Sequence, residues 1–246
     1  MESLALIAAA AVLAGAVAAV SGFGIGSLLT PLLVVSVPMP TADAVAVLAV
    51  PHALATAIRW ARLRHEVHGP TFREFGVASA AGGLAGAALQ TQLSSPRLTV
   101  VLAGLLVLAG TSELLRRRVP IPATPAWRLA GGVLSGVFGG LVGNQGGIRA
   151  AALLGFQLRP RQLVATATAS ALFVDAARVP IYFVSAGTAI AESTRLLLVM
   201  ALGVTLGTFL GVPVLGRIPD SIYRRLVGGL LVALGVGLAA AALVSR

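Results

Sequence analysis

The chain has 246 residues, of which 57% are hydrophobic and only 11% are charged. A soluble domain carries roughly 25% charged residues, so this composition excludes a water-soluble globule and indicates an integral membrane protein with several spans. The net charge is +10, but the arginines gather in short clusters between apolar stretches and aromatic residues make up 5%, which argues against nucleic-acid binding. Cysteine is absent from the sequence, which rules out disulfides and thiolate metal sites.

In chain order, the apolar stretches predict eight full-length transmembrane helices and two shorter ones. A helix needs about 20 apolar residues to cross a hydrocarbon core of about 30 Å. The full-length candidates are residues 3–20, 41–58, 75–92, 97–115, 128–143, 163–185, 193–215 and 222–244. The first of them follows Glu2 rather than a basic region, so we interpret it as a retained span and not as a signal peptide. The stretches 24–38 and 147–158 are shorter and each follows a glycine cluster, which predicts broken or re-entrant helices.

The positions of the arginines favour a topology in which both short stretches cross the membrane. In that arrangement the basic clusters at 59–73, 116–118, 159–161 and 217–225 all face the cytoplasm, as the positive-inside rule requires. Both termini then lie outside, periplasmic or extracellular, in a bacterial plasma or inner membrane. If the short stretches only dipped in and returned, the last cluster would fall on the opposite side.

This topology divides the chain into two halves, 1–118 and 119–246, that form one transport unit. Each half has five segments, and because five is odd the second half is inverted relative to the first. A shift of 121 residues pairs Gly22 with Gly143 and Gly26 with Gly147, so Gly-rich breaks at 21–26 and 143–147 occupy matching positions. Paired breaks of this kind indicate where a transporter binds its substrate. We therefore expect an all-α membrane fold with a 5+5 inverted repeat.

The first break, "SGFGIGSLLTPLL" (residues 21–33), carries groups suited to an oxyanion. Gly22, Gly24 and Gly26 offer backbone amides and Ser27 a hydroxyl, at the start of a helix whose dipole favours an anion. Close packing of helices through small residues is the alternative interpretation.

The second break, "GLVGNQGGIRAAALL" (residues 140–154), is richer in polar side chains. Amides buried in hydrocarbon without partners are costly, so we expect Asn144 and Gln145 to bind substrate together with the amides of Gly146 and Gly147. Arg149 either contacts the same oxyanion or extends to water at the membrane surface. On the next predicted helix, the hydroxyl of Thr166 is a further candidate ligand.

Asp175 and Arg178 are three residues apart and therefore share one face of a helix. The pair is either a structural bridge or a proton-coupling carboxylate beside a cation that also contacts substrate. His52, on the matching helix of the first half, is the second candidate for proton coupling, with a packing role as the alternative. The sequence has no catalytic set, nucleotide-binding loop or metal-ligand cluster, so we expect no enzymatic activity, no cofactor and no metal.

In both halves a Gly-rich stretch is followed by an Ala/Thr-rich helix: "SGFGIGSLLTPLLVV" with "TADAVAVLAVPHALAT", and "GGLVGNQGGIRAAALLGF" with "QLVATATASALFVDAARVPIYF". In this layout the chain resembles the sulfite exporter TauE/SafE family, also described as the toluene sulfonate uptake permease (TSUP) group. The resemblance implies secondary transport of small sulfur-containing or organic anions such as sulfite, sulfonates or sulfoacetate. We expect an exporter that works by alternating access coupled to protons and that is surrounded by membrane lipid. A homodimer is compatible with the sequence. A passive anion channel is the alternative.

Overall fold

The computed structural model describes residues 2–21, 25–37, 39–115, 124–215 and 219–244, and these ranges are helical with no strand among them. The long helices before the central connection are α1 (Glu2–Ser21), α3 (Thr41–Leu63), α5 (Val77–Gln90) and α6 (Ser95–Leu114), with the shorter α2 (Gly26–Ser36) after the first break. Three short turns join α3 to α5: the 3-10 turn η1 (Arg64–Glu66), α4 (Gly69–Thr71) and the π-helical turn η2 (Phe72–Gly76).

The second part of the chain repeats this order of long and short helices. It contains α7 (Pro125–Val142), the short α8 (Gly146–Leu154), α9 (Pro160–Ser185), α10 (Gly187–Glu192), α11 (Thr194–Leu215) and α12 (Asp220–Val244). The two short stretches that the sequence predicts thus form helices of 11 and 9 residues. The turns between α3 and α5, and α10, were not predicted.

Within the described residues, five helices are long and apolar enough to cross a membrane, fewer than the eight full-length spans expected. They are Thr41–Glu66, Ser95–Leu114, Pro160–Ser185, Thr194–Gly211 and Ser221–Leu243, with the shorter apolar helices Leu4–Ala19 and Gly26–Ser36 beside them. The stretch 75–92 falls short because η2 takes up its start and leaves α5 with 14 residues. Large apolar side chains cover the outside of the bundle, as they do where a protein faces lipid; Leu202, for example, is 72% exposed.

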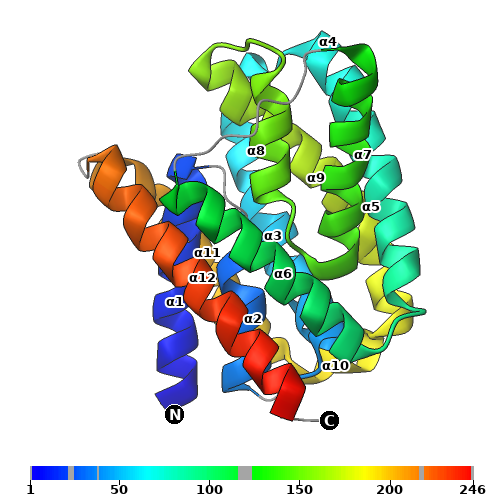
Figure 1. Cartoon of the computed structure of the whole chain (residues 1–246), viewed down its shortest axis with the longest axis vertical. Helices are drawn as coiled ribbons and strands as arrows, with labels where there is room; N and C mark the ends of the chain where they lie inside the picture. The colour runs from blue at the N-terminus through cyan, green and yellow to red at the C-terminus, as the bar shows by residue number, and fades with distance from the viewer. Residues whose placement is uncertain (1, 22–24, 38, 116–123, 216–218, 245–246) are drawn as a thin grey trace.

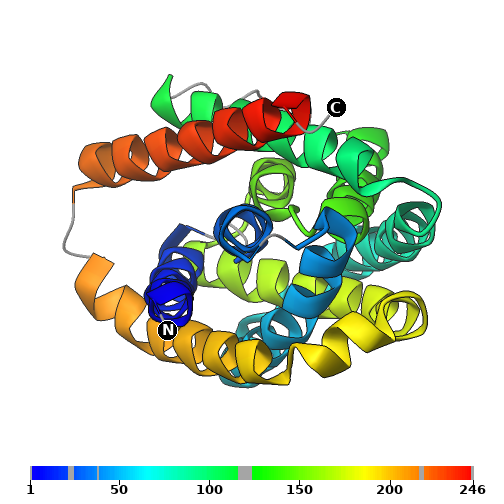
Figure 2. The same cartoon turned by 90° about the horizontal axis from the view of Figure 1, so that it is seen from below.

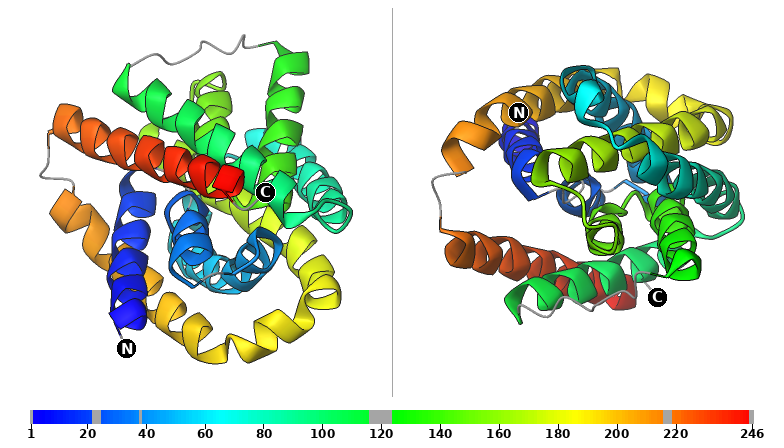
Figure 3. Two further views of the ribbon diagram at one scale, coloured as in Figure 1. Left: turned by 60° about the horizontal axis from the view of Figure 1, so that its bottom comes forward. Right: turned by 90° about the horizontal axis from the view of Figure 1, so that it is seen from above.

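The two short helices lie inside the bundle. Viewed along the bundle, α2 and α8 appear nearly end-on near the centre and the longer helices surround them (Figure 2 and Figure 3, right). In Figure 1, α8 occupies the upper half of the molecule and α2 the lower half. The start of α2 and the turn before α8 therefore approach each other in the middle of the protein.

The ends of the bundle differ in what they carry. The first turn of α1 and the last turn of α12 lie at the lower end in Figure 1, whereas α4 lies at the upper end. The upper end therefore carries the basic connection between α3 and α5. The clusters at 116–118 and at Arg217 lie outside the described residues.

Glycines allow the long helices to pack in close pairs, of which the most extensive are α1 with α11, α5 with α7, and α6 with α12. A Cβ atom at Gly207 of α11 would overlap the Val12 carbonyl oxygen of α1, and one at Gly86 of α5 would overlap the Val137 carbonyl oxygen of α7. Such close approach of backbones is the main source of helix association in lipid, where apolar burial contributes little.

We expect Gly207→Ala to lower the thermal stability of the detergent-solubilised protein, because the added methyl group must push α11 away from α1. The matched control is Gly237→Ala in α12, where a Cβ atom would meet nothing within 4 Å. That substitution removes a flexible residue from a helix interior and is worth up to about 1 kcal/mol of added stability. Equal melting temperatures for the two variants would contradict the packing role of Gly207.

Candidate functional site

The two breaks meet through a side-chain hydrogen bond. The Ser27 hydroxyl of α2 donates to Asn144 Oδ1 across 2.8 Å, although the two residues are 117 positions apart. The backbones also touch, because a Cβ atom at Gly26 would overlap the carbonyl oxygen of Gly143. Gly143 itself ends α7 with a φ of 71°, a left-handed conformation that favours glycine. Gly22 and Gly24, the other two glycines expected here, lie outside the described residues.

Gln145 brings an unsatisfied amide to this junction. It directly precedes Gly146, the first residue of α8, and is 1% exposed. Within the described part of the chain, neither its side-chain nitrogen nor its side-chain oxygen has a hydrogen-bond partner. A buried polar group left without a partner costs about 1–3 kcal/mol, so this amide is suited to a ligand. The N-terminus of α8, with Gly146 and Gly147, lies next to it.

Arg149 is buried one turn further along α8. Its side chain is 6% exposed, which contradicts the alternative in which it extends to water. The charges of Arg59, Asp175 and Arg178 are close enough to interact with it electrostatically. The structure therefore places Arg149 in the interior, in the electrostatic field of three other charged side chains.

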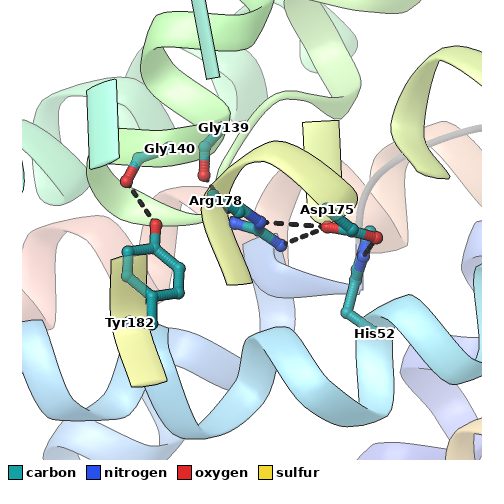
Figure 4. Close-up of polar contacts among 6 residues, drawn as sticks. All are labelled: His52, Gly139, Gly140, Asp175, Arg178 and Tyr182. Atoms are coloured by element: carbon teal, nitrogen blue, oxygen red, sulfur yellow. Dashed lines mark hydrogen bonds and ion pairs between the residues drawn. The ribbon is translucent and has the colours of Figure 1, made fainter. Parts of the chain in front are cut away.

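A buried cluster of three charged or titratable side chains lies between α3 and α9. His52 Nδ1 lies 2.7 Å from Asp175 Oδ2, while Arg178 Nε donates to Asp175 Oδ1 at 2.9 Å and Arg178 Nη2 lies 2.8 Å from the same oxygen (Figure 4). None of the three is more than 3% exposed. The spacing of Asp175 and Arg178 predicted their pairing, and the structure adds His52 as the second partner of the carboxylate.

The same cluster supports the end of α7, which terminates inside the protein. The last carbonyl groups of a helix have no partner within it and need donors from elsewhere, above all in a membrane. Arg178 Nη1 donates to the Gly139 carbonyl at 2.5 Å, and Tyr182 Oη donates to the Gly140 carbonyl (Figure 4). Gln90 Nε2 donates to the Leu141 carbonyl at 3.2 Å. All three nitrogens of the Arg178 guanidinium are thus engaged by the protein, which favours a structural role over substrate contact.

Tyr182 and Gln90 were not singled out from the sequence, although each carries a signal. Tyr182 is one of two tyrosines in the chain and follows Arg178 by four residues, on the same helical face. Gln90 is a polar residue in the last turn of α5, whose other residues are apolar or small. Both signals become specific only once the end of α7 is known to be buried.

Thr166 has a different environment from the one expected. Its hydroxyl accepts a hydrogen bond from the backbone N–H of His68 at 3.0 Å, and its carbonyl accepts one from the Ser170 hydroxyl at 2.8 Å. The hydrogen bond with His68 therefore links the connection after α3 to the first part of α9. No described contact joins it to Asn144 or Gln145.

Half-length helices inside an apolar bundle, with buried polar groups where they meet, define the protein as a multi-pass membrane transporter. The chain belongs to the sulfite exporter TauE/SafE family, whose family model matches residues 7–238. Membership confirms the family resemblance and implies membrane transport of sulfur-containing anions, so the protein is a transporter and not an enzyme. Comparisons with curated proteins and with solved structures gave no match.

We expect Tyr182→Phe to lower the melting temperature, because the Gly140 carbonyl loses its hydroxyl donor in an apolar interior. The expected cost is about 1–3 kcal/mol, the range for a buried polar group left unpaired. Tyr223→Phe is the matched control, since that hydroxyl makes a longer hydrogen bond of 3.4 Å to Val17. A Tyr182→Phe variant as stable as the wild type would mean that the Gly140 carbonyl does not need this donor.

Proposed function

We propose that the protein is a secondary transporter that exports a small sulfur-containing or organic anion such as sulfite, a sulfonate or sulfoacetate. The observation that supports this most directly is the Ser27–Asn144 hydrogen bond, which joins the two breaks beside the unsatisfied amide of Gln145. An oxyanion is the ligand that such a junction suits, because it accepts hydrogen bonds from amides, hydroxyls and helix N-termini.

The balance of buried charge also supports an anionic substrate. Among the described residues, the buried side chains with a full charge are Arg149, Arg178 and Asp175, two cations for one anion. Excess charge in a low-dielectric interior is costly, and a bound anion offsets it. In this proposal the substrate is held by the side chains of Ser27, Asn144, Gln145 and Arg149, and by the backbone amides of Gly22, Gly24, Gly26, Gly146 and Gly147. Arg178 and Thr166 position the helices around it.

Alternating access follows from a 5+5 inverted repeat with halves 1–118 and 119–246. The helix pairs support this interpretation, because the shift of 121 residues carries α1 onto α7 and α5 onto α11. The pair α1–α11 is then the counterpart of the pair α7–α5, and Gly207 is the counterpart of Gly86. We place the arginine-rich end that carries α4 in the cytoplasm and both termini outside.

Proton coupling is assigned to His52 and Asp175. The Asp175 carboxylate contacts both His52 and Arg178, and Arg178 in turn donates to the Gly139 carbonyl at the end of α7. A proton added to this carboxylate weakens both ion pairs and loosens α9 from α7, next to the junction of the two breaks. Binding of a proton and rearrangement at the anion site are thereby linked.

We expect Arg149→Gln to weaken sulfite uptake into proteoliposomes while the protein still folds and inserts. Loss of a charged hydrogen-bond donor is worth about 1.5–3 kcal/mol, or about tenfold to hundredfold in affinity. Arg195→Gln is the control, because that arginine is exposed at the start of α11 and lies outside the proposed site. Uptake by Arg149→Gln with wild-type affinity would remove this residue from the proposed site.

We expect Asp175→Asn to abolish proton-driven accumulation of the anion but not its passive equilibration. The measurement is uptake of labelled sulfite against a concentration gradient, with and without an imposed proton gradient. Asp43→Asn, in the first turn of α3, serves as the control and is expected to keep coupling. If the wild-type protein only equilibrates sulfite under a proton gradient, it is a passive anion channel.

A further inference from the structure

Two arginines each donate a hydrogen bond, through Nη1, to the helix that precedes one of the two breaks. Arg178 Nη1 of α9 donates to the Gly139 carbonyl of α7 at 2.5 Å, and Arg59 Nη1 of α3 donates to the Ala18 carbonyl of α1 at 2.9 Å. Ala18 and Gly139 are 121 residues apart, so they are equivalent positions under the shift that relates the halves. The arginines themselves are offset by two positions under this shift. Each half thus has an arginine on its long central helix that holds the helix before the break.

The two arginines differ in what their remaining nitrogens contact. Arg178 Nε donates to the carboxylate of Asp175, three residues earlier on the same helix. The residue three positions before Arg59 is Thr56, which has no charge. In the described part of the chain, Arg59 Nε is buried and has no hydrogen-bond partner, and the same is true of Thr56 Oγ1. The first half therefore lacks the carboxylate that satisfies the arginine of the second half.

A cavity opens beside Arg59. It has a volume of about 600 Å³ and lies between α1, α3, α9 and α11. Among the described residues, Arg59, Arg62 and Arg161 line it with a single carboxylate, Glu66, and most of its remaining wall is apolar. The guanidinium of Arg62 lies 4.0 Å from the centre of the Phe209 ring, so a cation and an aromatic surface occur together. The cavity carries net positive charge and has room for a small organic molecule.

We propose that this cavity is a second anion-binding site, in which an oxyanion binds the Arg59 guanidinium that lines it, as the Asp175 carboxylate binds Arg178. Arg62 supplies a second positive charge, and Phe209 supplies an apolar surface for the organic part of a sulfonate or carboxylate. The charges of Arg59 and Arg149 interact, so the site lies within electrostatic reach of the junction of the breaks. The cavity is thus an antechamber for the transported anion. The role as an antechamber and the choice of sulfite and sulfonates as ligands rest on the proposed function; the anion-binding site itself does not.

The test uses the full-length protein in nanodiscs of zwitterionic lipid, with benzenesulfonate and sulfite as probes. Trp60 directly follows Arg59, and a Trp127→Phe background makes it the only tryptophan. We expect saturable changes of Trp60 fluorescence with either anion. Thr56→Asp places a carboxylate three residues before Arg59 and is expected to weaken binding by about tenfold to hundredfold, the worth of a charged hydrogen bond. Thr56→Val, which removes the hydroxyl without adding charge, is expected to bind as the wild type does.

A second variant keeps the test decisive if Thr56→Asp does not fold. Arg62→Gln changes an exposed residue that does not hold α1, and we expect it to weaken binding severalfold. Wild-type affinity in whichever of these variants folds overturns the proposal. A Trp60 response to nanodiscs that contain anionic lipid, without any response to the two free anions, also overturns it and assigns the cavity to a lipid headgroup.

These outcomes are separable from those of the proposed function. If the protein transports neither sulfite nor a sulfonate but binds benzenesulfonate in a Thr56-sensitive manner, the second anion-binding site stands and the proposed function fails. If transport depends on Arg149 while Thr56→Asp leaves binding unchanged, the proposed function stands and the antechamber is wrong.

Discussion

The end of α7 inside the protein is the constraint on which the site depends. A helix that stops in an apolar interior exposes carbonyl groups that water cannot reach, and the structure meets this need with donors from two other helices. Arg178 and Tyr182 come from α9, and Gln90 comes from α5. These bonds fix where α7 stops, and therefore where the chain turns at Gly143 and where α8 begins. The polar groups of Asn144 and Gln145 occupy this turn.

The use of arginines as donors to these carbonyl groups also explains the charge of the interior. An arginine is an effective donor to an exposed carbonyl because its guanidinium is planar and carries several N–H groups, but each one brings a positive charge into the core. In the second half Asp175 balances that charge, and His52 contacts the other oxygen of the carboxylate. In the first half Thr56 stands in the corresponding place before Arg59. The arginines that support the helices before the two breaks thus also bring into the interior the positive charge on which the proposed binding of anions rests.

Hydropathy predicted most of the helices, including the two short ones that became α2 and α8, because these depend on local composition. The pairing of Asp175 with Arg178 was also predictable, since three residues bring side chains to one helical face. The contact of His52 with Asp175 was not, because it spans 123 residues. Arg59 was interpreted only as a topology signal, since the apolar stretch ends at residue 58, whereas α3 continues to Leu63 and buries Arg59 Nε. The shortening of α5 by η2 also escaped prediction, because a π-helical turn has no distinct hydropathy.

The pairing of helices across the halves has a consequence for biosynthesis. When the ribosome has completed α6, the partners of α1, α5 and α6 do not yet exist, because α11, α7 and α12 come later in the chain. Until their partners are made, the small-residue faces of these first helices contact lipid or the insertion machinery. For α1 this lasts until α11, which begins at Thr194, has been inserted. The packing of α1 and α6 is therefore completed only late in synthesis, whereas α5 acquires its partner as soon as α7, the next helix, has been inserted.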